Sequence, residues 1–199
     1  MEQSTDFVLL QCALADATGL AHAATQWCAD SAVPMTLHRA AWRGASQTAY
    51  VYGRLAARER LADDATPALA TLWARDCVTA RDIRVSRLER VFDAPGASHG
   101  ETPLFHYVVE MTPEDGWKDE IGRWYDAEHM PGLAAVPGCI HARRLINHDC
   151  GPLSLACYDL VSEETLGSPP WLAVRGTAWS DVTRPHFTKT RRTMMKVIA

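Results

Sequence analysis

One short stretch of the sequence gathers most of the residues that could do chemistry. Between Trp124 and His129 the chain reads Trp-Tyr-Asp-Ala-Glu-His, which places two aromatic rings, two carboxylates and an imidazole within six residues. Histidine is the side chain whose proton exchanges near neutral pH, and a neighbouring carboxylate would raise its pKa. His129 is therefore the candidate general acid and base of this protein.

The residues around His129 supply its candidate partners. Tyr125 and Asp126 precede it by four and three residues, so on a helix either side chain could orient the imidazole. Together with His129 they are the expected catalytic residues. The expected ligand contacts are Trp124, Glu128, His186, Arg143 and Arg144.

A helix is expected to position this stretch. Apolar residues recur at helical spacing from Pro113 to His129, with Thr112 as the N-terminal cap. Pro131 and Gly132 are expected to end the helix. His129 would then lie in the last turn, partly exposed, where the negative end of the helix dipole favours an imidazolium. If His129 has no chemical role, it is a surface histidine that caps the helix end.

The predicted elements follow one order twice. Alternating or continuous apolar runs predict four strands in each half of the chain, with a helical pattern after the first and third strands. The strands are expected at 7–15, 34–43, 48–56, 82–92, 104–111, 139–147, 153–161 and 190–198, and the helical regions at 18–30, 60–79, 113–129 and 162–181.

A stretch rich in glycine, proline and small polar residues separates the two halves. We therefore expect an N-terminal unit at 1–93, a linker at 94–102 and a C-terminal unit at 103–199. Tryptophans near the ends of the predicted helices support a duplication, because Trp27 matches Trp124 and Trp73 matches Trp179 in the same order.

Two tandem βαββαβ units are typical of a ferredoxin-like duplication. Each unit would form an antiparallel sheet with two helices on one face, and its other, apolar face must be covered. The predicted fold class is therefore α+β, with two tandem ferredoxin-like units packing sheet to sheet as an α+β barrel.

The stretch from Trp124 to His129, called the motif below, also resembles a known family. A helix ending W-Y-D-x-E-H-x-P, followed by Val136-Pro137-Gly138 and an arginine-bearing strand, resembles the EthD-like proteins of the dimeric α+β barrel superfamily, from about Leu104 to the C-terminus. The resemblance implies a ligand cleft between helices and sheet, which His186 would also face. It implies a homodimer as well, because related units pair between chains. Haem stays open as a cofactor, because some relatives bind it through a helix histidine.

Composition excludes several classes of function. A net charge of −4 without a basic stripe gives no case for nucleic acid. The polar N-terminus is not a signal peptide and no apolar run could span a membrane, so we expect a cytoplasmic protein. The six cysteines show no metal-ligand spacing, and no nucleotide-binding motif occurs, so we expect neither a metal nor a nucleotide cofactor.

Three functions remain open. The first is a small-molecule enzyme that acts on an apolar or aromatic compound without a nucleotide cofactor, by an oxygenation, an isomerisation or a cyclisation. The second is a non-catalytic binding or structural module, in which the motif locks the helix and its loop onto the sheet. The third is a haem-binding protein. An inward His129 in a pocket of tryptophan and tyrosine favours the first, and an exposed His129 over a filled cleft favours the second.

Overall fold

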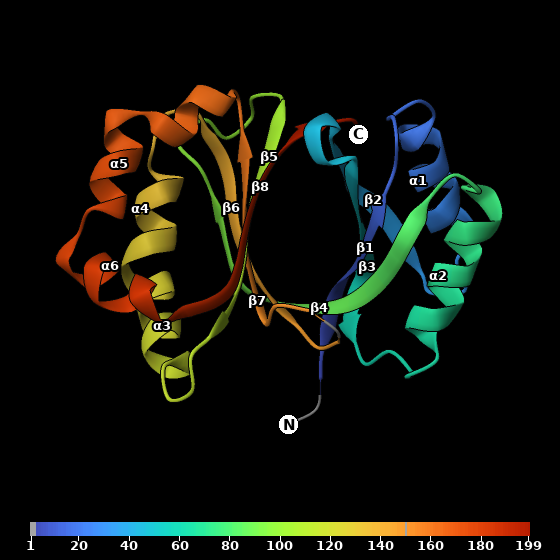
Figure 1. Cartoon of the computed structure of the whole chain (residues 1–199), viewed down its shortest axis with the longest axis horizontal. Coiled ribbons are helices and arrows are strands. Elements are labelled where there is room, and N and C mark those ends of the chain that lie inside the picture. The colour runs from blue at the N-terminus through green and yellow to red at the C-terminus, as the bar shows by residue number, and fades with distance from the viewer. Residues whose placement is uncertain (1–2, 150) are drawn as a thin grey trace. The chain divides into compact units, whose positions relative to one another are not determined.

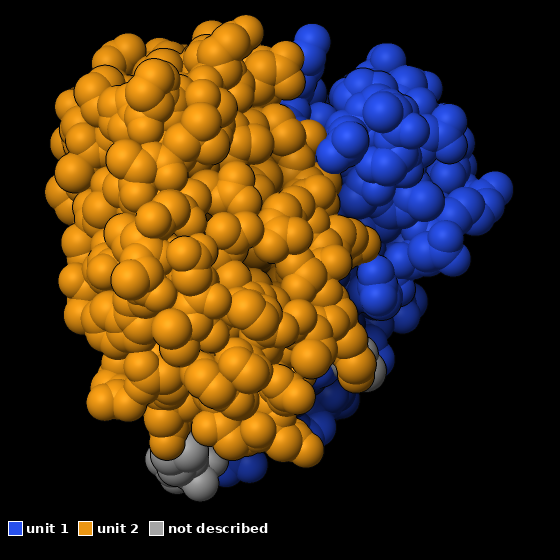
Figure 2. Space-filling model, turned by 60° about the vertical axis from the view of Figure 1, so that its left-hand side comes forward, with its two compact units in different colours: residues 1–89, 147–150, 195–199 blue, residues 90–146, 151–194 orange. Residues whose placement is uncertain are grey.

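The computed structural model describes residues 3–149 and 151–199. Cys150 and the first two residues lie outside the described part, so the expectations for this thiol and for the extreme N-terminus are not addressed by the structure. The chain forms two compact units, coloured separately in Figure 2. Unit 1 comprises residues 1–89, 147–150 and 195–199, and unit 2 comprises residues 90–146 and 151–194.

Unit 1 is an antiparallel sheet with two helices on one face (Figure 1). Its hydrogen-bonded strand order is β4-β1-β3-β2. The core between helices and sheet includes Trp27 and Trp73, whose rings meet edge to face at 6.0 Å. The elements are β1 (Thr5–Ala13), α1 (Leu20–Asp30), β2 (Met35–Arg43), η1 (Gly44–Ser46), β3 (Thr48–Glu59), α2 (Ala65–Asp76) and the first part of β4 (Arg81–Pro95).

Unit 2 repeats this plan with more helical segments, all on one side of its strands in Figure 1. Its strand order is β8-β5-β7-β6-β4. The elements are β5 (Phe105–Pro113), α3 (Lys118–Trp124), the π-helical turn η2 (Tyr125–His129), α4 (Met130–Ala134), β6 (Cys139–Asn147), β7 (Ser154–Leu160), η3 (Glu163–Gly167), α5 (Pro169–Arg175), α6 (Ala178–Thr183), η4 (Arg184–His186) and β8 (Phe187–Val197).

The predicted fold class is confirmed. Strands and helices alternate as βαββαβ twice, and the strand order closes on itself as β1-β3-β2-β8-β5-β7-β6-β4. The long strands β4 and β8 each run from one unit into the other along the chain. Several predicted boundaries were too wide or too narrow, most of all for the helix at 60–79, which forms only over Ala65–Asp76.

The helix that carries the motif differs from its prediction at both ends. Pro113 is the last residue of β5, not the first turn of a helix, and the helix begins at Lys118. At the other end the helix does not stop at Pro131 but continues to Ala134. Proline is tolerated there because it lies in the first turn of α4, directly after the widened turn η2, where its missing N–H costs little.

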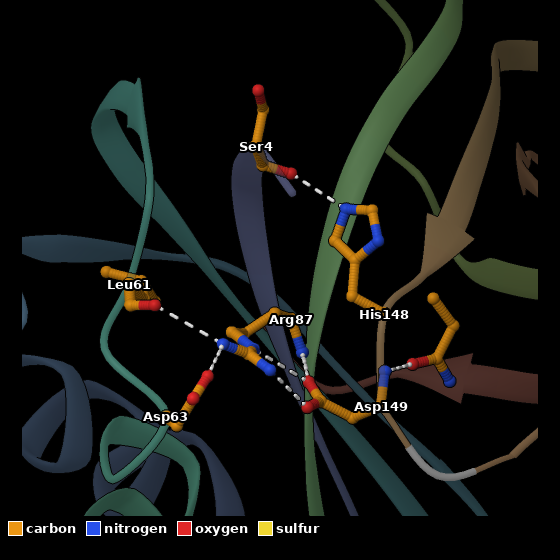
Figure 3. A network of polar contacts seen from close by, with 7 residues as sticks. Ser4, Leu61, Asp63, Arg87, His148 and Asp149 are labelled. Atoms are coloured by element: carbon orange, nitrogen blue, oxygen red, sulfur yellow. Dashed lines mark hydrogen bonds and ion pairs between the residues drawn. The ribbon is translucent and has the colours of Figure 1, made fainter. Parts of the chain in front are cut away.

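A network of polar contacts surrounds Arg87 (Figure 3). It includes His148 and Asp149, which follow β6 and belong to unit 1. The Asp149 carboxylate accepts hydrogen bonds from the Arg87 backbone N–H at 2.6 Å, from its Nε at 3.1 Å and from its Nη2 at 2.8 Å. The Nη1 group of Arg87 donates to the Leu61 carbonyl at 3.2 Å and to Asp63 at 3.1 Å. His148 bonds the Ser4 carbonyl at 2.9 Å. The buried guanidinium therefore joins three segments of unit 1.

Replacing Arg87 by Met should destabilise the protein by about 3 kcal/mol, because the largely buried Asp149 carboxylate loses its charge partner. Asp63→Asn is the matched control: its side chain is 92% exposed, so the loss should stay below about 1 kcal/mol. Urea unfolding measures both. Equal losses would show that the contact with Asp149 does not dominate the network.

Candidate functional site

A pocket in unit 2 lies between the helices and the sheet. Its free volume is about 30 Å³, enough for one or two water molecules. The lining combines aromatic rings, one imidazole and three guanidinium groups. It consists of Tyr107, Val109, Trp124, Tyr125, His129, Leu133, Tyr158, Trp171, Arg175, Arg184, Phe187 and Arg192.

The π-helical turn brings His129 to this pocket. Trp124, Tyr125 and His129 are all buried, so one side of this helix carries three rings into the core of unit 2. The chain widens into a π-helical turn over Tyr125–His129, a feature that is frequent at functional sites. The His129 ring stacks on Trp124, with centroids 4.1 Å apart, and meets Tyr125 edge to face at 5.6 Å.

A glycine lets the neighbouring helix close over the pocket. A Cβ atom on Gly132 would lie 2.8 Å from Cγ1 of Val174, so only glycine permits α5 to approach α4 this closely. Val174 precedes Arg175, one of the lining guanidinium groups. The Pro131-Gly132 pair therefore does not end the helix; its glycine sets the distance of α5 from the motif.

His129 is buried and electrostatically disfavoured as a cation. Its side chain is largely enclosed, and Nδ1 has no hydrogen-bond partner among the described protein atoms. Burial, together with the positive charges of Arg184 and Arg175, lowers its pKa to about 3. The expectation that a carboxylate would raise this pKa in an exposed last turn was wrong. The imidazole is neutral at physiological pH.

The phenol groups of the pocket also remain uncharged. Burial raises the pKa of Tyr125, Tyr107 and Tyr158 above the usual value for a phenol. The Tyr158 hydroxyl donates to Sδ of Met130 at 3.1 Å, and its ring stacks with Tyr107 at 6.2 Å. These rings form an apolar wall of protonated phenols beneath His129.

The predicted orienting carboxylate lies elsewhere. Asp126 is exposed, and its oxygens accept hydrogen bonds from Nη2 of Arg144 at 2.8 and 3.0 Å. The same guanidinium lies 5.5 Å above the centre of the Tyr125 ring. Asp126 therefore acts on the pocket only through Arg144 and Tyr125, and packing rather than a hydrogen bond orients His129.

The remaining predicted ligand contacts do not line the pocket. Glu128 accepts a hydrogen bond from Oγ1 of Thr177 at 2.6 Å, which ties the motif to the N-terminal cap of α6. His186 stacks on Trp117 at 3.4 Å and bonds Glu114 through Nδ1 at 2.6 Å.

Arg143 likewise points to a different partner. Its Nε donates to Asp93 at 2.8 Å, and His141 bonds the same carboxylate oxygen at 2.7 Å. The structure thus brings His129, Tyr125 and Trp124 together in the pocket, and it places Asp126, Glu128, His186, Arg143 and Arg144 in contacts around it.

The sequence did not indicate the cationic part of the site. Arg175, Arg184 and Arg192 come from α5, η4 and β8, and no spacing rule connects them. Burial and the repulsion of the other two arginines lower the pKa of Arg184, against a smaller opposing effect of Asp181. None of the three side chains forms an ion pair with any residue in the described ranges 3–149 and 151–199.

No group of three histidine, cysteine, aspartate or glutamate side chains that could hold a metal ion occurs at positions 3–149 and 151–199. Within those ranges, no helix is long and apolar enough to cross a membrane.

The low pKa of His129 makes a prediction about acid stability. The unfolded state takes up this proton near pH 6.5 and the folded state only near pH 3, so stability should fall as the pH decreases through this window. The contribution is about 1.4 kcal/mol per pH unit. Urea unfolding at several pH values should show a shallower acid slope for His129→Gln than for the wild type.

The exposed His22 provides the control for this measurement. His22→Gln should keep the acid slope of the wild-type protein. A slope that is the same in wild type and His129→Gln would contradict the buried, neutral imidazole.

Comparisons with known proteins find similarity at the level of structure. No protein-family model matches the chain, and no curated protein matches it. Among solved structures, a protein named as a monooxygenase from Lactobacillus acidophilus NCFM is 13% identical, with a TM-score of 0.59 over 98% of this chain and 93% of that one. An anthrone oxidase-like protein is 13% identical, with a TM-score of 0.60 over 98% and 92%.

A mutant chlorite dismutase from Candidatus Nitrospira defluvii, in complex with cyanide, is also similar: it is 8% identical, with a TM-score of 0.59 over 98% of this chain and 92% of that one. At such identities the likeness shows the fold alone, an α+β fold built from ferredoxin-like units.

Proposed function

We propose that this chain is an EthD-like enzyme of the monooxygenase type that acts on a small aromatic compound without a nucleotide cofactor, with His129 as its general base. One observation carries the proposal. His129 is buried and neutral, its Nδ1 has no hydrogen-bond partner among the described protein atoms, and the residue lines a pocket of tryptophan and tyrosine. A buried polar atom without a partner is rare and usually has a functional explanation.

The proposed chemistry starts with a proton transfer. The neutral imidazole of His129 takes a proton from a weakly acidic C–H or O–H group of the bound aromatic compound. Arg175 and Arg184, whose charges disfavour the imidazolium, stabilise the anion that forms. The same anion offsets their effect on His129, so the base strengthens as the negative charge develops.

Molecular oxygen then serves as the oxidant. With anthrone, the acidic methylene group would lose a proton to His129, and the resulting enolate would react with O₂ to give anthraquinone and water. One oxygen atom enters the ring carbonyl and the other leaves as water, so atoms and electrons balance. The fold shared with the anthrone oxidase-like protein makes anthrone a reasonable first probe.

The remaining roles follow from packing. Trp124 and Tyr125 hold the imidazole in place through ring contacts, and Asp126 is a positioning residue that fixes Arg144 over the face of Tyr125. We further propose that the C-terminal unit at 103–199 carries the activity. The N-terminal unit at 1–93, joined by the linker at 94–102, has no counterpart of Glu128-His129. In this proposal it is the copy that serves only as a structural scaffold. A homodimer is proposed from the resemblance.

A structural role for the motif is the second candidate. The bonds of Glu128 to Thr177 and of Asp126 to Arg144 lock the motif onto α6 and β6, as a structural module would require. Haem is the third candidate. Haem and anthrone both exceed the free volume of about 30 Å³, so either ligand requires the pocket to open, and the larger macrocycle requires the wider opening.

The test compares His129→Gln with the wild type in the aerobic oxidation of anthrone, followed by oxygen uptake and anthraquinone absorbance. Loss of the general base should lower kcat by about 100-fold or more, while the melting temperature near neutral pH changes little. The exposed His22→Gln variant should keep the wild-type rate. Equal rates in wild type and His129→Gln would contradict the role of His129, and binding of anthrone without turnover would favour the binding module.

A further inference from the structure

The charged groups that line the pocket are all cationic hydrogen-bond donors. The ring nitrogens of Trp124 and Trp171 are buried N–H donors that lack a partner among the described protein atoms. Arg175, Arg184 and Arg192 add guanidinium groups on three different elements, and one of their donors, Nη1 of Arg184, is used by the Arg175 carbonyl at 3.3 Å. Within the described residues, the lining includes no carboxylate.

The carboxylates near the pocket do not neutralise the positive charges of its three arginines. Asp126 and Glu128 of the motif are held by Arg144 and Thr177. Glu114 is held by His186. Asp181 acts on Arg184, yet the pKa of that guanidinium is still lowered by burial and by the other two arginines. Three like charges at one pocket repel one another, although water screens the exposed ones, and a ligand of opposite charge relieves the repulsion.

The geometry points to a ligand that supplies both missing features: we infer that the pocket binds an aromatic compound carrying an anionic oxygen, a carboxylate or an ionised phenol or enol, with the oxygen held by Arg175, Arg184 and Arg192 and the ring packed among Trp124, Tyr107 and Trp171. The ligand would occupy the same pocket as the substrate of the proposed reaction. The identification of this ligand as a substrate therefore rests on the proposed function, whereas its binding by the three arginines does not.

The free volume requires the rim to move when such a ligand enters. About 30 Å³ holds one or two waters and not an aromatic ring. Arg192 is exposed and Arg175 and Arg184 are partly exposed, so their long side chains can turn outward and then close on the anion. The stacked rings of Trp124 and His129 stay in place, because they belong to the core of unit 2.

Three probes separate charge from ring. Benzoate carries both features, benzamide keeps the ring and shape without the charge, and acetate keeps the charge without the ring. Binding is measured by tryptophan fluorescence and by NMR titration at constant ionic strength. Benzoate should bind the wild type about tenfold more tightly than either benzamide or acetate, the preference expected for one charge-assisted contact.

Variants test which residues cause the preference. Arg184→Gln and Arg192→Gln should each lower the preference for benzoate over benzamide, and the double variant should remove it. Arg123→Gln is the matched control, because this guanidinium is on the surface of α3 beside Glu120 and makes the same change of charge. If Arg184→Gln fails to fold, the exposed Arg192→Gln still decides the question.

The outcomes are distinct. Equal binding of benzoate and benzamide, a preference that survives the double variant, or no benzoate binding up to about 10 mM would each overturn the inference. In His129→Gln the preference should persist even though turnover is lost. A preference for benzoate without His129-dependent turnover would overturn the proposed function alone, whereas turnover of anthrone without the preference would overturn the inference alone.

Discussion

The structure of unit 2 depends on burying three rings of one helix against one sheet. Trp124, Tyr125 and His129 are all buried on one side of this helix, which widens into a π-helical turn over Tyr125–His129. The same helix sets the rest of the site: His129 stacks on Trp124, the helix continues through Pro131, and Gly132 lets α5 bring Arg175 to the pocket.

The electrostatics of the pocket follow from where the nearby carboxylates are used. The motif contains two of them, and the sequence alone suggested that one would serve His129. Both instead satisfy partners outside the pocket, Arg144 and Thr177. No carboxylate of the described lining opposes the charges of Arg175 and Arg184. Together with burial, these charges lower the pKa of His129 and keep its imidazole neutral.

Unit 1 follows the same plan of strands and helices. Its two core tryptophans, Trp27 and Trp73, pack edge to face between helices and sheet. Nε1 of Trp27 donates to the Leu69 carbonyl at 3.0 Å, whereas Nε1 of Trp73, like Nε1 of Trp124 in unit 2, has no partner among the described protein atoms. The pocket of unit 2 differs from this tryptophan pair in its lining, which adds His129 and three guanidinium groups to the aromatic rings.

The sequence by itself determined the order of the elements and the α+β class, because hydrophobic periodicity and turn residues are local signals. It did not give the ends of the motif helix, which begins at Lys118 and continues to Ala134, because tertiary packing overrides local propensity at such positions. The tertiary structure alone decided which charges meet. Arg175, Arg184 and Arg192 lie on separate elements, and only the fold brings them to one pocket, where burial and mutual repulsion set the chemistry.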